Sequence, residues 1–390
     1  MTGGTRGCAP AAGLIPAVGP STASPTGEGA CRRCLAGAML RHSLAGVLDC
    51  CARDPARLID LLDLQDDELI SAIGGRRRQE LRLLHRRLLR QAPPAAWRGA
   101  LCRHDRRFPR ALGGRGGPSV LALSCEPARL QRLTAGPVVA VAGSRRCSDY
   151  GAEVTRALAR GLAAAGITVA AGLGDRLSHA AHEGVLQAGG ASIAVAARGL
   201  GRAGPAAARG LLAGVRERGC VVCELPADAP ARRWQAPAAQ RTLIGLCSVL
   251  VVAEAQESGP DALAVRLARS QGCPLGAVPG RVGSPLSRWP HALLRDGARL
   301  VEGAADVLEM LHLAPLDERA PGAGADADCG GCGEQLDARL RGVLDEVSAG
   351  SGAPEEISCA GARDALLALS ELELLGLVVR GSGGRYRRKL

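Results

Sequence analysis

The chain has 390 residues, which is enough for one large domain with one or two small ones. Its net charge is +11, and Lys389 is the only lysine among 49 basic residues, so a surface rich in arginine and a polyanionic partner are expected, although GC-rich coding would also favour arginine over lysine. No segment is apolar over enough residues to span a bilayer, which excludes a helical membrane protein and predicts no membrane partner.

The cysteines and the first residues indicate the compartment. Fifteen cysteines are present, and residues 1–20 lack the pattern of a signal peptide, because Pro10 and Pro16 interrupt their apolar stretch. We therefore expect a cytoplasmic protein with reduced thiols.

The N-terminal part is expected to contain a tail and a small domain. Residues 1–40 are rich in Gly, Ala, Pro, Ser and Thr without a period, which predicts a disordered tail. Residues 41–92 are typical of a small helical domain, with Leu58, Leu61 and Leu62 at helical spacing and a break at Gly74 and Gly75. A basic helix follows, and either a phosphate backbone or solvent suits its charged face equally well. Its arginines are Arg76, Arg77, Arg78, Arg82, Arg86, Arg87 and Arg90.

Residues 105–312 alternate short β-branched runs with helices of about ten to fifteen residues, as in βαβ units. The pattern predicts an α/β fold with an extended, Rossmann-like, doubly wound parallel sheet. The expected strands cover residues 138–142, 167–171, 192–196, 220–224, 249–253, 275–278 and 299–301.

The C-terminal part is expected to hold a linker and a second small domain. Residues 313–334 are rich in Gly, Ala and Asp, and residues 335–390 predict helices followed by a hairpin that flanks residues 381–384. Helices followed by a hairpin are the outline of a winged helix.

In a doubly wound sheet, ligands bind at the carboxyl ends of the strands, so the loops there carry the expected site. The first loop holds Gly143, Ser144, Arg145 and Arg146 and leads through Tyr150 into a helix. Glycines, a helix N-terminus and paired arginines suit a phosphate, and a plain turn is the weaker alternative. The loop is neither a dinucleotide fingerprint nor a P-loop, so no nucleotide cofactor is expected.

The second loop offers Gly172, Gly174 and Arg176 to a phosphate. His179 and His182 follow on one helix face, where packing or capping is favoured over a metal because no third ligand stands at a suitable spacing.

Two further loops complete the expected site. One holds Arg232, Arg233 and Trp234, with Arg241 on the next helix, and the other holds Gly280 and Arg281. Three of the chain's six aromatic side chains lie in these loops, which favours base stacking over hydrophobic plugs. They are Tyr150, Trp234 and Trp289. We predict one basic groove lined by Arg145, Arg146, Arg232, Arg233 and Arg241.

In this order, these loops resemble the DNA-processing protein A (DprA/Smf) family. The matching motifs are Gly143-Ser144-Arg145, Gly172-Leu173-Gly174 with His182, Glu224-Leu225-Pro226, Arg232-Arg233-Trp234, Gln240-Arg241, Val278-Pro279-Gly280, Leu293-Leu294-Arg295 and the lead-in Phe108-Pro109-Arg110-Ala111-Leu112. The resemblance is strong over about residues 105 to 310 and weak in both flanks.

The chain also departs from the family pattern. Residues 175–178 read Asp-Arg-Leu-Ser instead of Arg-Gly-Ile-Asp, residues 235–239 lack an aromatic and positive charge, residues 258–261 read Ser-Gly-Pro-Asp, and His291 stands for Asn. These differences predict weaker DNA binding than is usual in the family.

The resemblance implies a non-catalytic protein, without a cofactor, that binds and protects single-stranded DNA and loads a RecA-type recombinase in natural transformation. It also implies a homodimer. The alternative is a nucleotide- or small-phosphate-binding enzyme of the phosphoribohydrolase type, but the Pro-Gly-Gly-x-Gly-Thr signature of those enzymes is absent, and no other catalytic constellation stands out.

Two Cys-x-x-Cys pairs, Cys31/Cys34 and Cys329/Cys332, supply four thiols suited to zinc or to redox chemistry. They stand at opposite ends of the chain, so we assign no metal ligand to them. Cys220 and Cys223 lie within an expected strand and are interpreted as core.

Overall fold

The computed structural model describes residues 29–114, 116–202, 208–258, 260–313 and 338–348, and, further on, residues 357, 364–365, 368–369, 372, 378–380 and 386–388. The chain forms two compact units that meet in sequence at Arg319 and Ala320. Each unit is described by itself.

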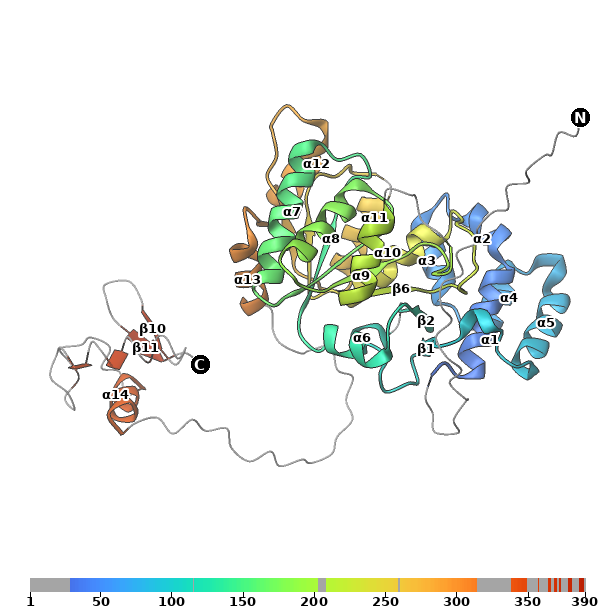
Figure 1. The fold of residues 1–390 in the computed structure, drawn as a ribbon, viewed down its shortest axis with the longest axis horizontal. Coiled ribbons are helices and arrows are strands. Elements are labelled where there is room, and N and C mark those ends of the chain that lie inside the picture. Colours follow the sequence, from blue (N-terminus) through green and yellow to red (C-terminus); the bar gives the residue numbers. More distant parts are fainter. Residues whose placement is uncertain are drawn as a thin grey trace, which may run out of the picture. The chain divides into compact units, whose positions relative to one another are not determined.

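The first unit begins with a region of five helices, drawn in blue at one end of the sheet in Figure 1. The leucines chosen for their spacing are buried, and Gly74 ends the fourth helix, as predicted. The first helix starts at Arg32, within the stretch expected as a disordered tail, because Leu35 and Ala38 pack into a small core. The average composition of residues 1–40 does not reveal this packing. The helices are α1 (Arg32–Ser43), α2 (Ala45–Cys51), α3 (Pro55–Asp63), α4 (Asp66–Ile73) and α5 (Arg78–Arg90).

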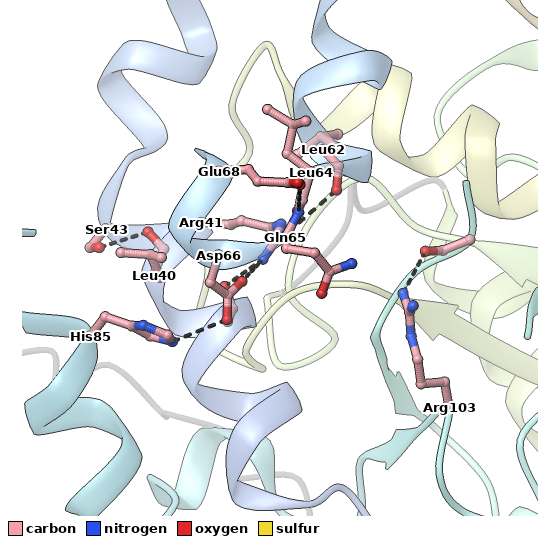
Figure 2. A network of polar contacts seen from close by, with 12 residues as sticks. Leu40, Arg41, Ser43, Leu62, Leu64, Gln65, Asp66, Glu68, His85 and Arg103 are labelled. Atoms are coloured by element: carbon pink, nitrogen blue, oxygen red, sulfur yellow. Dashed lines mark hydrogen bonds and ion pairs between the residues drawn. The ribbon is translucent and has the colours of Figure 1, made fainter. Parts of the chain in front are cut away.

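A polar network ties three of these helices together (Figure 2). The Arg41 guanidinium of α1 lies 2.6 Å from Asp66 Oδ1 at the start of α4, and it donates at 2.6 Å to the Leu64 carbonyl. The other carboxylate oxygen of Asp66 lies 3.0 Å from His85 Nε2 of α5. Because Arg41 and Asp66 are both largely enclosed, this network fixes the angles between the helices as well as satisfying their charges.

The sheet has nine strands in the order β1-β2-β6-β5-β4-β3-β7-β8-β9, and the seven strands from β3 to β9 are parallel. All seven predicted strands are present, with ends that differ by at most one residue. The strands are β1 (Leu101–Cys102), β2 (Val120–Leu123), β3 (Val138–Ala142), β4 (Thr168–Ala171), β5 (Ser192–Val195), β6 (Cys220–Cys223), β7 (Val249–Val252), β8 (Leu275–Ala277) and β9 (Arg299–Leu300).

Strands β1 and β2 were not predicted. They extend the sheet beyond β6 in antiparallel order. Strand β1 has only two residues, which is too short for a periodic signal, and β2 is set apart by glycines rather than by a crossover helix. This edge carries the helical region.

Helices cover both faces of the parallel sheet. On β3, Val138 and Ala140 face the side of α10, α11 and α12, whereas Val139 and Val141 face the side of α7, α8 and α13. Both sets are buried, which explains the unbroken apolar runs of these strands. The helices are α6 (Pro127–Leu133), α7 (Asp149–Ala164), α8 (Arg176–Gln187), α9 (Arg209–Arg218), α10 (Gln235–Leu246), α11 (Pro260–Ser270), α12 (Arg288–Arg295) and α13 (Ala304–Leu313).

The second unit holds helix α14 (Ala338–Ser348) and a hairpin of β10 (Val378–Arg380) and β11 (Tyr386–Arg388), which pairs as predicted. Val343 of α14, Val378 and Tyr386 share one small core. Most of the remaining residues between 349 and 377, where a further helix was expected, lie outside the described residues, and so do Cys329 and Cys332. The winged helix therefore stays a prediction.

Among the residues described, the helices are too short or too polar for any of them to cross a membrane.

Candidate nucleic-acid interface

The predicted site lies at the carboxyl edge of the parallel sheet. The loops that follow β3, β4, β6 and β8 all leave this edge, because their strands run in the same direction. Strand β6 lies three positions from β3, a separation of about 14 Å at normal strand spacing.

The loop between β3 and α7 is closed by a carboxylate from the segment just after β7. Glu254, which is 4% exposed, accepts the Ser148 backbone N–H at 2.6 Å and the Ser148 hydroxyl at 2.7 Å. The same hydroxyl accepts the Gly151 N–H at 3.2 Å. A Cβ at Gly143 would stand 2.5 Å from the Glu254 carbonyl oxygen, so the glycine there permits a close approach of two strands. Two backbone donors at the start of α7, the Ser148 and Gly151 N–H groups, therefore bond within the protein and are not available to a phosphate.

Positive charge nevertheless reaches the surface of this loop. The side chains of Arg145 and Arg146 are exposed, while Ser144 is buried and its N–H bonds the Glu254 carbonyl. Arg176, from the start of α8, donates to the Cys147 carbonyl at 3.3 Å and pairs with Asp149. Arg176 therefore lies where it was expected, although Asp149 compensates part of its charge.

The loop between β4 and α8 is capped in a similar way. The Asp175 carboxylate, which replaces a basic residue of the family pattern, accepts the Ser178 N–H at 2.7 Å and its hydroxyl at 2.8 Å. Gly174 is exposed and Gly172 is half-buried. The departure from the family pattern thus makes a helix cap, which leaves fewer donors for an anion.

His182 is a core residue, as its placement on the helix predicted. It is fully buried, and its Nε2 lies 3.0 Å from the Gly172 carbonyl, which can only accept. Nε2 must therefore carry the proton, and Nδ1 accepts from the Ser192 hydroxyl at 2.9 Å. Burial lowers the pKa of His182 to about 4, so the ring is neutral at physiological pH.

The loop after β8 is held to the first loop. The Tyr150 hydroxyl donates to the Pro279 carbonyl at 2.7 Å, and His291 Nε2 lies 3.1 Å from the Gly280 carbonyl. A Cβ at Gly280 would lie 2.1 Å from the Ser287 hydroxyl, so this glycine is required by packing. Arg281 is exposed. Tyr150 is half-buried, and Trp289 is half-buried against the core.

The loop between β6 and α10 contacts the helical region. Arg232 lies 3.3 Å from the Asp49 carboxylate of α2, which also accepts the Trp234 N–H at 3.1 Å. Trp234 is only 3% exposed, so its predicted role as a stacking surface is wrong; the indole fills the core between helix and sheet. Arg233 is exposed.

Arg241 is also buried, which corrects the predicted groove. Its guanidinium is 3% exposed and lies 2.8 Å from Asp63 of α3 and 2.6 Å from Glu224 at the end of β6. A buried arginine that two carboxylates hold has no free face for DNA. No sequence signal links Asp63 to Arg241, because the two residues stand 178 positions apart.

The site predicted from the sequence did not include the acidic side chains at this edge. Glu254 and Asp261 are buried there, and burial, together with the charge of Asp175, raises the pKa of Asp261 to about 6. The signal was available, since Asp261 stands in a segment that departs from the family pattern.

The predicted residues therefore divide into two groups. Arg145, Arg146, Arg176, Tyr150 and Arg281 belong to the loops of β3, β4 and β8, which contact one another. Arg232 and Arg233 belong to the β6 loop, beside the helical region. The exposed arginines of the first group, which stand on adjoining loops above the capping carboxylates, are called the exposed arginine cluster (Arg145, Arg146 and Arg281, with Arg176). Arg232 and Arg233 form a separate pair near α2.

Comparison with known proteins identifies the class. The model of the family described as DNA recombination-mediator protein A matches residues 99–312. The chain belongs to this family.

Particular relatives match a large part of the chain. The chain is 32% identical over 260 residues to Protein Smf of Escherichia coli K12, across 64% of this chain and 67% of the relative. It is 34% identical over 232 residues to the putative DNA processing protein DprA of Mycobacterium tuberculosis, across 58% of this chain and 59% of that one. Its fold is similar to that of DNA processing protein A from Streptococcus pneumoniae, with a TM-score of 0.54 at 28% identity over 63% of this chain and 86% of that one.

Proposed function

We propose that this DNA recombination mediator binds single-stranded DNA through the exposed arginine cluster at the carboxyl edge of its sheet. The observation that carries the proposal is that Arg145, Arg146 and Arg281 are exposed on loops that hydrogen bonds and tight glycine contacts hold in place. Guanidinium groups on a fixed frame bind phosphates along a strand at a small cost in conformational entropy.

The form of the site favours an extended strand over a small ligand. Glu254 and Asp175 accept backbone N–H groups at the starts of α7 and α8, which leaves fewer donors for an enclosed phosphate, and they place carboxylates beneath the loops. A mononucleotide in a closed pocket would meet those carboxylates. A flexible strand that passes over the exposed guanidiniums would not, and we propose that Tyr150, half-buried in the same loop, contacts a base. Because carboxylates stand where a small phosphate substrate would bind, we also propose that the protein is not an enzyme.

Helix α5 offers a second basic surface. Arg82, Arg86 and Arg90 are exposed and stand at successive four-residue spacings on one face. Such a row would extend the path of a long strand, and a longer oligonucleotide would then bind more tightly than a short one.

The test is fluorescence anisotropy of the full chain with a labelled oligonucleotide of mixed sequence. We expect single strands to bind more tightly than the matching duplex, and a mononucleotide in large excess to leave the strand bound. Displacement by a mononucleotide at equimolar concentration would contradict the proposal and favour an enclosed phosphate site. Binding to the duplex alone would contradict it as well.

We further propose that the protein acts as a homodimer in the cytoplasm and hands the strand to a RecA-type recombinase during transformation, as the family resemblance implies. Light scattering of the purified chain gives the oligomeric state. Recombinase filament formation on a strand already coated with single-strand-binding protein gives the loading activity, which we expect to rise when this protein is added.

A further inference from the structure

Four side chains that commonly bind metals meet at the junction of the helical region and the sheet. Cys31 and Cys34 come from the N-terminus of α1, Cys102 from β1, and His104 from the turn just after β1. The four ligand atoms all lie within 4.8 Å of one another. The sequence offered only the Cys-x-x-Cys pair, because Cys102 and His104 stand about 70 residues further along the chain.

The distances fit a tetrahedral centre. With Zn–S of about 2.3 Å and Zn–N of about 2.05 Å, a tetrahedral zinc sets each sulfur about 3.5 Å from the imidazole nitrogen. His104 Nδ1 lies 3.3 Å from Cys34 Sγ, 3.5 Å from Cys31 Sγ and 3.9 Å from Cys102 Sγ. Three sulfurs therefore surround one imidazole nitrogen at the separations that a shared ion imposes.

The surroundings also suit a bound cation. Cys102 is fully buried and Cys34 is 7% exposed, and the Cys31 N–H donates to Cys102 Sγ at 3.3 Å. A backbone N–H to sulfur bond of this kind stabilises a thiolate, the form of cysteine that binds metal. The neighbouring core contains Trp97 and Val120, so water has little access from that side.

Asp105 holds the two segments of the cluster together. Its buried carboxylate accepts the Gly29 N–H, just before Cys31, and pairs at 2.9 Å with Arg107. The backbone on both sides of the cluster is thus fixed without the ion, which would bind a site already close to its final geometry.

We propose that Cys31, Cys34, Cys102 and His104 bind one zinc ion as a structural Cys₃His site. Four protein ligands fill a tetrahedral zinc completely, which leaves no position for a reacting water. All of α2 to α5 lies between Cys34 and Cys102. The ion would therefore clip the first helix of that region to the edge of the sheet, and closing a long loop in this way stabilises the folded state most.

The test measures the zinc content of the full chain, purified under reducing conditions without chelators. We expect about one zinc per chain, retained on dialysis. Cys31→Ser and His104→Ala alter the two more accessible ligands and should lower the bound zinc at least tenfold. Cys50→Ser changes an exposed cysteine outside the cluster and should leave the zinc content unchanged. The double variant Cys329→Ser/Cys332→Ser should also keep its zinc.

A second measurement tests the site without removing a ligand, so that its result does not depend on a variant that folds poorly. Cobalt(II) added to the metal-free protein should give the visible bands of a tetrahedral ion and a near-ultraviolet thiolate band. His104→Cys preserves four ligands, so it should bind zinc in equal amount and gain thiolate absorption. The proposal is overturned if reduced protein binds no zinc when the ion is supplied, or if Cys31→Ser keeps full zinc. It is also overturned if the Cys329/Cys332 pair proves to be required for zinc binding. Disulfides at Cys31, Cys34 or Cys102 in the purified protein would overturn it as well.

Discussion

The buried guanidinium of Arg241 lies 2.6 Å from the carboxylate of Glu224, which is largely enclosed at the contact between the sheet and the helical region. Asp63 of α3 completes the set at 2.8 Å. Arg241 and Glu224 both belong to motifs by which the chain resembles its family. Two of those motifs therefore meet inside the protein to hold its parts together, and DNA is not needed to explain their presence.

Removal of Arg241 should therefore destabilise the protein. Arg241→Ala would leave Asp63 without this partner and Glu224 with only the Thr242 hydroxyl. We expect a cost of about 3 kcal/mol in the free energy of unfolding, the lower end for a broken buried pair, because both carboxylates are partly exposed. Urea denaturation of the full chain, followed by circular dichroism, measures this loss. Arg160→Ala, an exposed arginine of α7, is the matched control and should change the free energy by less than about 0.5 kcal/mol. Equal stability of the two variants would show that the buried ion pairs contribute little.

His182 should make the protein sensitive to acid. Its pKa is about 4 in the folded state and near 6.5 in the unfolded chain, so unfolding takes up a proton below about pH 6.5. The contribution is complete above pH 6.5 and is lost as the pH falls toward 4, by about 3 kcal/mol at most.

Denaturation at pH 7.5 and at pH 5 should therefore show a smaller loss of stability in His182→Gln than in the wild type. His312→Gln, an exposed position, serves as the control and should keep the wild-type pH dependence. The same loss in both variants would contradict a neutral, buried His182.

Asp261 should have the opposite effect. Its folded pKa of about 6 lies above the ordinary value of 3.8, so ionisation destabilises the fold as the pH rises through 4 to 6. Asp261→Asn keeps a carbonyl acceptor for its backbone contact and should stabilise the protein at pH 8 by up to about 3 kcal/mol, with little gain at pH 4. Glu217→Gln, at an exposed site, should change stability little at either pH. A destabilised Asp261→Asn at pH 8 would contradict this interpretation.

Glu254 should control the order of the arginine-bearing loop. Glu254→Ala removes both hydrogen bonds to Ser148, a loss of about 2 to 3 kcal/mol for a charged acceptor. Hydrogen exchange should quicken over residues 144–151 in this variant, while the loop after β6 stays protected as in the wild type. Unchanged exchange at residues 144–151 would mean that the loop is ordered without the carboxylate.

The sequence predicts the parallel sheet well, because buried strands such as β3 have apolar side chains on both faces. It also places Arg145, Arg146 and Arg281 on loops at the correct edge. It misplaces Trp234 and Arg241, because burial of a polar or aromatic side chain depends on partners such as Asp63 and Asp49, which lie far away in sequence. It also misses strand β1, which is too short to give a periodic signal, and the proximity of Cys34 to Cys102, because these two residues stand far apart in sequence.

The central claim is that the exposed arginine cluster binds the phosphates of a single strand. Its most direct test is the salt dependence of the anisotropy-derived affinity for Arg145→Ala/Arg146→Ala. Arg132→Ala/Arg160→Ala is the control, since both of its arginines are exposed toward the amino end of β3. Loss of two phosphate contacts should flatten the slope of log K against log salt by about 1.4 in the first variant, with no change in the control. Equal slopes in the two variants would contradict the claim.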